Sequence, residues 1–553
     1  MKLIYLLAIC AIIFLPSCKK DVASVADLQI SGFGPAAFVG GDAISIYGSG
    51  FDIDPEKNIV SFNGAKGEVA TASPNRLQVI VPTLTTSGNL TVTVNGKTVT
   101  SKQRYSIVNL LQGTYNDNFI LTSDKQYLLR GDVVFKSKLI IQPGTVIYGE
   151  KYTHASLTAS DVDFEGTAEH PIIFTSDQPP GRRNPGDWKG VTISAVQSGQ
   201  TAIPNGIVQY MRVEYAGYFV LGNTTQYGFN GPWWGAALNI TPTSSSTYKY
   251  LQVSYSASDG FSFGSYNNVF GGDGFFHHLI AFGCAGADYR IHTSGVKAQF
   301  GLGLKDPYYA NPDKSHGIVN FYNAGNMNQL SNFTLVGFNP DARNILNAGP
   351  SVNGDAGYGV KIGTSYYPDG SYGGGQDNFG LFNSLIAAGM KAGVVIEGTN
   401  DYNWTNYESG GNLQVQVRNC FITGTAPRQL PTQGGIFGHP NWRLVSTPFL
   451  DITTDPKFAL FASLNDTTRQ LSFSQSKDDL GIKDLVDFQK LNNPGLTLPA
   501  SSILINSAQF PPGSNVFSPY FDKNTTWVGA FGTEDWSRPW ANFSPQTTNY
   551  NNN

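Results

Sequence analysis

The stretches LIIQPGTVI at residues 139–147, GTAEHPIIFTS at 166–176 and DWKGV at 187–191 decide the fold. Each is an apolar run of strand length beside turn-forming residues. Similar runs recur at residues 208–215, 250–255, 278–282, 332–336, 383–387 and 419–423. Strands that recur with irregular insertions are what a parallel β-helix needs, because each coil buries its inward side chains only by stacking on the next. We therefore predict an all-β chain with a parallel β-helix over residues 111–545, followed by a polar tail at 546–553.

A smaller module precedes the predicted β-helix. Residues 25–108 contain short alternating strands, such as AISIY at 43–47 and LTVTV at 90–94, broken by glycine turns. This pattern is typical of a β-sandwich. The stretches at 40–51, 60–64, 79–82 and 88–92 resemble the immunoglobulin-like IPT/TIG fold. The resemblance implies a spacer or a binding platform, and we favour a spacer.

The runs of the predicted β-helix, together with WVGAF at 527–531 and WSRPW at 536–540, resemble a group of secreted right-handed β-helix proteins. Its members largely lack an assigned activity, so the resemblance implies a fold rather than a function. Members of the group carry paired acids followed by Gly-Phe-Glu near the centre, with more acids in the next coil. Here the corresponding stretches are SDGFS at 258–262 and GADYR at 286–290, which hold fewer acids.

The N-terminus has the order of a secretory signal peptide: Met1-Lys2, an apolar stretch, and then LPSC at residues 15–18. The residues before Cys18 resemble a lipobox, which implies cleavage after residue 17 and attachment of lipid to Cys18. An ordinary signal peptide with an incidental cysteine is the alternative. Residues 18–24 would form the anchor and linker. We expect an outer-membrane lipoprotein on the cell surface, although the sequence leaves the side of the membrane open.

Composition narrows the classes of partner. Charged residues make up 14% of the chain and the net charge is -4, which argues against nucleic acid, because binding phosphates needs a basic surface. The expected partners are the membrane, through the lipid, and a polysaccharide. Beyond the signal region only Cys284 and Cys420 remain, too few for a disulfide framework. We expect buried thiols, with a single disulfide between the two left open.

Acids and bases are dense between residues 259 and 316. Polysaccharide-cleaving enzymes use such groups as paired carboxylates, or as a cation set against a uronate together with a base. The alternative is that acids beside glycine cap turns and that adjacent histidines point to opposite faces of a strand. No zinc-site spacing is present, so no cofactor is expected except calcium, whose weak candidate ligands are Asp259, Asp273 and Asp288. The candidate catalytic residues are Asp259, Asp273, His278, Asp288, Arg290 and His292.

Aromatic residues in polar insertions are the preferred candidates for a binding surface. Their rings can stack on the apolar faces of sugars, while neighbouring amides and carboxylates bind hydroxyls. The alternative is that they pack their own loops onto the coils. The candidate ligand-binding residues are Tyr227, Phe229, Trp233, Trp234, Tyr366, Tyr367 and Trp404.

The sequence therefore favours a cell-surface lipoprotein that binds glycans or other extracellular ligands without catalysis. The first alternative is an enzyme, either a polysaccharide lyase or a glycoside hydrolase, whose acids and bases would have to meet in one groove. The second alternative is an adhesin or structural envelope protein, which would not depend on Trp233 and Trp234.

Overall fold

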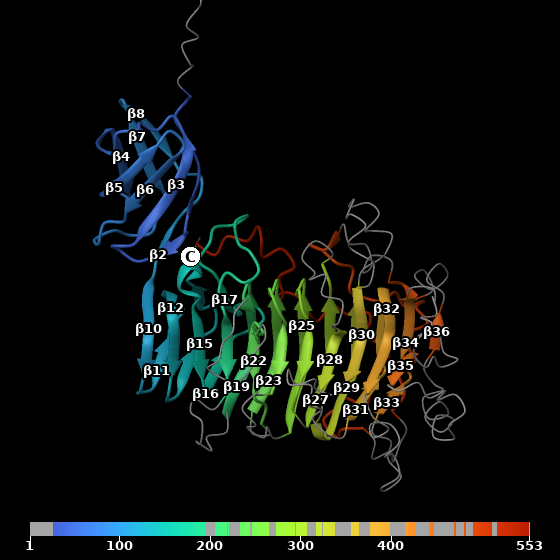
Figure 1. The fold of residues 1–553 in the computed structure, drawn as a ribbon. Helices are drawn as coiled ribbons and strands as arrows, with labels where there is room; N and C mark the ends of the chain where they lie inside the picture. Colours follow the sequence, from blue (N-terminus) through green and yellow to red (C-terminus); the bar gives the residue numbers. More distant parts are fainter. Residues whose placement is uncertain are drawn as a thin grey trace, which may run out of the picture.

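A computed structural model describes residues 26–194, 205–217, 219–220, 233–243, 246–264, 273–293, 295–306, 317–322, 324–337, 356–363, 377–398, 415–425, 442–446, 469–471, 480–482, 490–510 and 517–551. The predicted signal peptide, Cys18 and its linker lie outside these residues. The described chain is nearly all-β, with a small sandwich standing over one end of a long stack of parallel strands (Figure 1). The predicted fold class is thereby confirmed. Within the described residues no helix is long and apolar enough to cross a membrane.

The N-terminal sandwich is antiparallel, with its strands in the order β1-β3-β6-β5-β4-β7-β8, and β2 pairs with β9 beside it. Asn63-Gly64 and Asn95-Gly96 all have positive φ and close the hairpins β4–β5 and β7–β8, as expected for tight two-residue turns. The strands are β1 Gln29–Gly34, β2 Ala37–Phe38, β3 Ala43–Ser49, β4 Asn58–Phe62, β5 Ala65–Ser73, β6 Arg76–Ile80, β7 Leu90–Val94, β8 Lys97–Thr100 and β9 Ser106–Ile107; a 3-10 turn, Pro55–Lys57, precedes β4.

The stack that follows is a three-sided β-helix, and we name its sides faces A, B and C. Face A begins β12-β14-β17-β19-β23, face B begins β12-β15-β18-β22-β24, and face C begins β11-β13-β16-β19-β23. Long strands such as β19 and β23 turn a corner, so one strand contributes to faces C and A. All these pairings are parallel, as the sequence predicted.

The strands of the first coils are β10 Asn109–Tyr115, β11 Phe119–Leu121, β12 Gln126–Phe135, β13 Leu139–Ile141, β14 Val146–Gly149, β15 Ser156–Ala159, β16 Asp161–Glu165, β17 Ile172–Ser176, β18 Gly190–Ile193, β19 Asn205–Glu214, β22 Leu238–Ile240 and β23 Ser246–Ser254. The later ones are β24 Phe261–Phe263, β25 Gly274–Phe282, β26 Tyr289–Ile291, β27 Val296–Leu304, β28 Gly317–Tyr322, β29 Ala324–Val336, β30 Ala356–Gly363, β31 Asp377–Phe382, β32 Leu385–Gly398, β33 Val415–Arg418, β34 Phe421–Thr425, β35 Trp442–Ser446 and β36 Arg469–Leu471. A hairpin of β20 Phe219–Val220 and β21 Trp233–Trp234 projects between β19 and β22.

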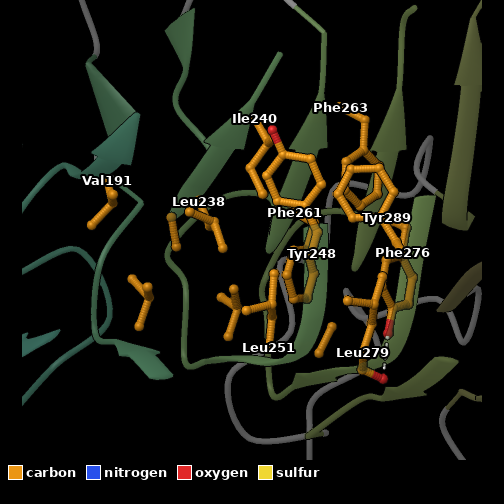
Figure 2. Packing of buried hydrophobic residues seen from close by; sticks show 14 of the residues in the cluster. Val191, Leu238, Ile240, Tyr248, Leu251, Phe261, Phe263, Phe276, Leu279 and Tyr289 are labelled. Carbon is orange, nitrogen blue, oxygen red and sulfur yellow. Dashed lines mark hydrogen bonds between the residues drawn. The ribbon is translucent and has the colours of Figure 1, made fainter. Parts of the chain in front are cut away.

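Inward side chains stack in columns through the β-helix (Figure 2). On face B, Leu238 lies in register with Phe261, and Phe261 with Tyr289, with the rings of the latter pair stacked at 5.4 Å. Every second residue of a strand faces inward, so the short apolar runs in the sequence fill one continuous core. Each fully buried side chain of this size contributes roughly 1.5–3 kcal/mol. Cys284 and Cys420 are both free and buried, and burial raises the pKa of each thiol to about 12.

From β19 onward, the corner between faces C and A holds one left-handed residue in each coil. Aromatic rings occupy it first: Tyr210 stacks on Tyr250 at 4.4 Å and Tyr250 on His278 at 4.5 Å. Asparagines occupy it later, at Asn332 and Asn383 among others, and asparagine tolerates positive φ well. The left-handed positions with their φ values are Tyr210 47°, Tyr250 56°, His278 58°, Phe300 63°, Asn332 56°, Asn383 46° and Asn419 51°.

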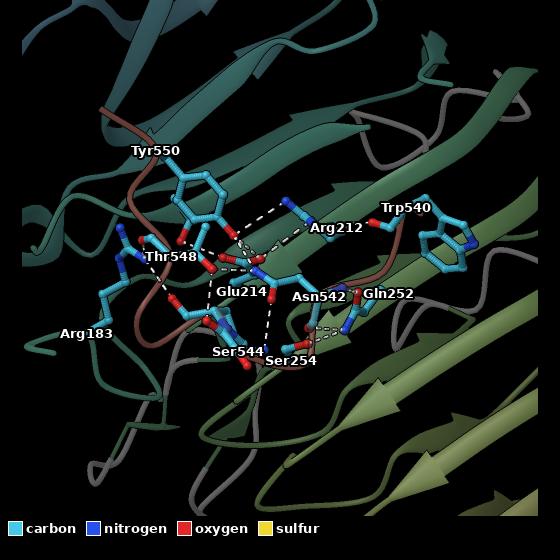
Figure 3. Close-up of polar contacts among 12 residues, drawn as sticks. Arg183, Arg212, Glu214, Gln252, Ser254, Trp540, Asn542, Ser544, Thr548 and Tyr550 are labelled. Atoms are coloured by element: carbon cyan, nitrogen blue, oxygen red, sulfur yellow. Dashed lines mark hydrogen bonds and ion pairs between the residues drawn. The ribbon is translucent and has the colours of Figure 1, made fainter. Parts of the chain in front are cut away.

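Residues 490–510 and 517–551, which we call the C-terminal segment, return along this corner towards the start of the β-helix. Asn419 donates to the Ser507 carbonyl at 2.7 Å, and Asn332 donates to the Trp527 carbonyl at 2.7 Å. Nearer the first coils, the Gln252 amide bonds both the N–H and the carbonyl of Asn542 (Figure 3). The order of contacts along the segment is therefore the reverse of the order of the coils.

The C-terminal segment also covers the outer side of face A. Ile280, Leu302 and Leu304 point outward there and are fully buried. They form a second hydrophobic cluster with the segment, to which it contributes Leu496, Leu498, Leu504, Val528, Ala530, Phe531 and Trp540. Trp540 is 1% exposed and meets the rings of Tyr210 and Tyr250 edge-on.

Three parts of the chain meet where the sandwich joins the β-helix. Arg130 on β12 donates to both carboxylate oxygens of Asp42 in the sandwich at 2.9 Å, and also binds Glu150. From the other end of the chain, Tyr550 and Asn551 bind Tyr148, and Asn551 donates to the Arg104 carbonyl at 3.1 Å. The sandwich, the first coils and the C-terminal segment are thus packed together.

Candidate functional site

The outer side of face B carries polar residues in register from β15 to β30, between Val134 on β12 and Val395 on β32. Thr158 lies in register with Thr192, Thr192 with Asn239, Asn239 with Ser262, and Ser262 with Arg290. The register continues from Arg290 to Asn320 and then Lys361. Adjacent strands are about 4.8 Å apart, so the positions repeat at that interval along the β-helix. We call these seven positions, none of them acidic, the face B row.

Local sequence directs the row away from the core of the β-helix. On this outer side Thr158, Thr192 and Asn239 are half-buried, and Ser262 and Arg290 are buried. In β18 and β22 one polar residue, Thr192 or Asn239, stands between apolar neighbours. Because side chains alternate across a strand, inward apolar neighbours direct the middle residue outward. In the described residues, the C-terminal segment makes its hydrogen bonds to faces A and C, to the corners and to the sandwich, and none to face B.

Arg290 is held in the row by an acid from the preceding coil. Its Nε lies 2.5 Å from Asp259 Oδ2, while Asp259 Oδ1 accepts from the backbone N–H of Ala287 at 2.7 Å. Arg290 is 7% exposed and Asp259 is fully buried. This buried pair orients the guanidinium and balances its charge, because a buried charge without a partner is strongly unfavourable.

A second buried pair lies at the corner before β26. Lys305 Nζ is 2.8 Å from Asp288 Oδ1 and also donates to the carbonyls of Cys284 and Gly286. Burial raises the pKa of Asp288 to about 6, against the opposing effect of Lys305. The Asp288 carboxylate is therefore engaged in its ion pair with the Lys305 ammonium group.

His292 contacts the row from the end of β26. Its Nε2 lies 3.0 Å from Ser262 Oγ, within hydrogen-bonding distance. Burial, with a smaller contribution from Arg290, lowers the pKa of His292 to about 3, so the imidazole is neutral near pH 7. A hydroxyl beside a neutral imidazole is the starting geometry for an activated nucleophile, and it also fixes the hydroxyl in one orientation.

The six predicted catalytic residues fall into separate groups. Four of them lie on β26 or directly beside it, as described above: Asp259, Asp288, Arg290 and His292. Asp273 is exposed at the start of β25 on face C. His278 lies in the corner between faces C and A, stacked between Tyr250 and Phe300, and burial lowers its pKa to about 3. The structure brings four of the six together.

The three predicted calcium ligands do not form one cluster. Asp259 binds Arg290 and Asp288 binds Lys305, while Asp273 lies on another face. Across the described ranges, no group of three or more His, Cys, Asp or Glu side chains is arranged to hold a metal ion.

Two family models match the chain. Residues 28–107 match the IPT/TIG domain, and residues 113–364 match the pectate-lyase-like beta helix domain. The chain carries an IPT/TIG domain followed by a pectate-lyase-like β-helix domain. The match confirms the IPT/TIG resemblance of the first module. For the second module it confirms a β-helix and describes it as pectate-lyase-like.

No curated protein matches the chain. Among solved structures, a Bacteroides thetaiotaomicron VPI-5482 protein described provisionally as a phosphatase is 27% identical over 14% of this chain and 18% of its own, with a TM-score of 0.14. Auxiliary nutrient binding proteins from the same organism and from Bacteroides ovatus ATCC 8483 are 21% and 18% identical over 16% of this chain and 24% of theirs, each with a TM-score of 0.14. The chain thus spans under a quarter of these proteins, and at these TM-scores the likeness carries no argument.

Most of the predicted aromatic surface lies outside the described residues, namely Tyr227, Phe229, Tyr366, Tyr367 and Trp404. For Trp233 and Trp234 only the backbone is described, as the strand β21 of the β20–β21 hairpin. This hairpin leaves the pectate-lyase-like β-helix immediately before β22, the strand that carries Asn239. Trp234 is therefore close in sequence to the face B row.

Of the face B row, sequence reasoning predicted only Arg290 as a site residue, and it also missed the partner of Asp288. Thr158, Thr192 and Asn239 did carry a signal, since each is a single polar residue between inward-facing apolar ones. No sequence signal pointed to Lys305, because its contact with Asp288 depends on how two coils of the β-helix stack.

Proposed function

We propose that this protein is a cell-surface lipoprotein that binds a glycan along the face B row without cleaving it. The observation that carries the proposal is the row itself, which aligns hydroxyl, amide and cationic side chains along the axis of the β-helix. A linear chain of sugars presents hydroxyls at regular intervals, and a regular row of donors and acceptors suits such a ligand.

The β20–β21 hairpin adds the apolar part of the proposed site. It carries Trp233 and Trp234 on the strand that leads to Asn239. Sugar sites usually combine an aromatic ring that stacks on the pyranose with polar groups that bind its hydroxyls. The hairpin and the row would therefore act on the same ligand.

The state of the acids supports binding without catalysis. Glycoside hydrolysis needs two carboxyl groups on either side of the scissile bond, one of them able to donate a proton. Asp259 and Asp288 are both fully buried, and each is in contact with a cation, Arg290 or Lys305. Neither carboxylate is placed to reach a sugar lying on face B.

A polysaccharide lyase is the second candidate, because Arg290 and the Ser262–His292 pair lie together on face B. In such an enzyme Arg290 would bind a uronate carboxylate and His292 would accept the neighbouring proton. Formation of unsaturated products from polygalacturonate, followed by absorbance, would favour this candidate over a binding protein.

The proposed location rests on the N-terminal sequence. A lipid on Cys18 would hold the chain at the outer membrane, with the IPT/TIG domain as a spacer between the membrane and the β-helix. Metabolic labelling with a palmitate analogue, lost in Cys18→Ser, would test the lipid, and protease accessibility on whole cells would test the exposed side.

A glycan-array screen of a soluble chain beginning after Cys18 would test the binding function. We expect binding that falls about 10- to 100-fold in Arg290→Ala, since a hydrogen bond to a charged group contributes about 1.5–3 kcal/mol. Trp233→Ala/Trp234→Ala should weaken the same signal. Lys138→Ala is a control for the loss of a cation on another face, because Lys138 is paired with Asp163 on face C, and comparing the unfolding midpoints of the two variants checks that Arg290→Ala stays folded. Equal binding by the folded variants, or no binding to any glycan, would contradict the proposal and favour an adhesin or structural protein.

A further inference from the structure

The corner between β25 and β26 surrounds an ammonium group with oxygens. Lys305 Nζ lies 2.8 Å from Asp288 Oδ1 and 3.0 Å from the Cys284 carbonyl oxygen, and it also contacts the Gly286 carbonyl oxygen. The Lys305 side chain is 9% exposed and that of Asp288 is 0% exposed. One carboxylate and two main-chain carbonyls therefore share a single buried positive charge.

The two carbonyls are held in place without help from Lys305. The backbone N–H of Ala285 donates to the Ser256 carbonyl at 2.9 Å, and that of Gly286 donates to the Ser258 carbonyl at 2.8 Å. The next N–H, on Ala287, is bound by Asp259 Oδ1. Three successive N–H groups are thus tied to the preceding coil, so the oxygens of this turn stay in position if the Lys305 side chain is removed.

The Asp288 carboxylate has a second oxygen, Oδ2, that can also accept a hydrogen bond or contact a cation. Its Oδ2 is buried and has no hydrogen-bond partner among the described residues. A Cβ at Gly303 would lie 2.8 Å from this oxygen and 2.6 Å from the side chain of Ile318. A side chain at position 303 would therefore crowd the carboxylate, and the glycine leaves it room.

Oxygen donors of this kind bind hard cations such as those of the alkali and alkaline-earth metals, rather than zinc. The charge of the site decides which of these cations it can hold. Asp288 supplies one negative charge, and Asp259, an acid whose charge also acts on Asp288, is paired with Arg290. A single positive charge is balanced here, whereas a divalent ion would leave one buried charge without a partner, which is strongly unfavourable.

We propose that the turn from Cys284 to Asp288 is a monovalent-cation site, and that Lys305 fills it with its own ammonium group. The protein then needs no free ion at this corner, and the charge that balances Asp288 is tethered to the next coil. A chain that lacks the ammonium and its stem should take up ammonium or potassium ions instead. An ordinary ion pair between Lys305 and Asp288 predicts no such replacement.

Two variants of the full chain after Cys18 separate these possibilities. Lys305→Ala removes the charge and opens the space that the stem occupied. Lys305→Met removes the charge but keeps the space filled. Thermal unfolding of both, and of the wild type, would be followed in ammonium, potassium, calcium and choline chlorides at equal ionic strength. Choline carries the same charge as potassium but is too large for the site.

We expect the unfolding midpoint of Lys305→Ala to rise with ammonium or potassium concentration, saturably and by about 2 °C or more relative to choline. Lys305→Met and the wild type should show the same midpoint in all the salts. A Lys305→Ala chain that is equally unstable in every salt, or folds in none, would overturn the proposal. So would equal responses of the two variants, and a response to calcium alone would overturn the assignment of a monovalent ion.

Discussion

Faces A and B of the β-helix are alike on the inside and different on the outside. Both send apolar side chains into the common core at every second position. Outward positions on face A are apolar in the middle coils, as at Ile280 and Leu302, and polar in earlier coils, as at Arg212 and Gln252, and the C-terminal segment covers both kinds. Outward positions on face B are polar, as at Thr192 and Ser262. Inward residues therefore set the fold, whereas outward residues decide whether a face is covered by the chain itself or is left for a ligand.

The comparison also separates two roles that outward residues have within one coil. On face A the outward residues add to stability, because they build a second hydrophobic cluster. On face B the outward residues add little apolar burial, so their chemistry is open to serve binding. The following predictions test this division, beginning with the largest expected effect on stability.

Trp540→Ala should be the most damaging single change. It removes a ring that is 1% exposed and packs edge-on against Tyr210 and Tyr250. We expect the free energy of unfolding to fall by about 3–5 kcal/mol in denaturant titrations. Tyr152→Ala is the control, since that ring is 76% exposed and its loss should change little. Similar losses in the two variants would show that face A does not have a second core.

Leu302→Ala should cost somewhat less, because it removes one aliphatic side chain from the same cluster. Leu302 is fully buried between the outer side of face A and the C-terminal segment, so we expect a loss of about 2–4 kcal/mol in the free energy of unfolding. Binding of any glycan by the folded protein should be unchanged. A glycan affinity that falls together with stability would mean that the two faces are not independent.

Asp177→Asn tests the loop that joins face A to face B beside the sandwich. Burial, and the nearby Asp187 and Glu150 carboxylates, raise the pKa of Asp177 to about 8. An unfolded aspartate loses its proton near pH 4, whereas the folded one keeps it, so wild-type stability is full below about pH 4 and falls as the pH rises towards 8. Asparagine does not titrate. At pH 8.5 we expect the variant to be more stable than the wild type by about 1 kcal/mol or more, and near pH 4 we expect no advantage.

Thermal midpoints measured from pH 4 to 9 would check this prediction. Asp117→Asn, in an exposed turn, is the control and should follow the wild type at every pH. Parallel profiles for Asp177→Asn and the wild type would show that the Asp177 carboxyl is ionised in the folded protein, contrary to the expectation.

Thr192→Ala should have the smallest effect on stability. Thr192 is half-buried in the face B row, and its loss should change the free energy of unfolding by no more than about 0.5 kcal/mol. If the row binds a glycan, affinity should fall several-fold, as expected for one neutral hydrogen bond. Isothermal titration with a glycan identified on the array would measure it, and an unchanged affinity would remove Thr192 from the proposed site.

Local patterns predicted the coils because strand alternation is a local property. In GVTI, the alternation of Val191, Thr192 and Ile193 fixes which side chains of β18 point inward without knowledge of the rest of the chain. The same alternation held the information needed to find Thr192 and Asn239. Four candidate residues around β26 were found because they are close in sequence and their coils stack directly.

The return of the C-terminal segment could not be predicted in this way. Gln252 and Asn542 are 290 residues apart, and Asn332 and Trp527 are 195 apart. Nothing in either sequence neighbourhood specifies its partner, because the match arises only after the coils have formed. The same holds for the left-handed corner, where propensity favours Gly or Asn but stacking places Tyr250 and His278.

The reversed path of the C-terminal segment has a consequence for biosynthesis. Arg183 and Tyr148 in the first coils donate hydrogen bonds to residues 545–551, which are made hundreds of residues later. A chain that emerges from the ribosome in order therefore carries an uncovered face A until residues 490–551 have been made. A precursor that has not yet reached this segment lacks the contacts that close its first coils.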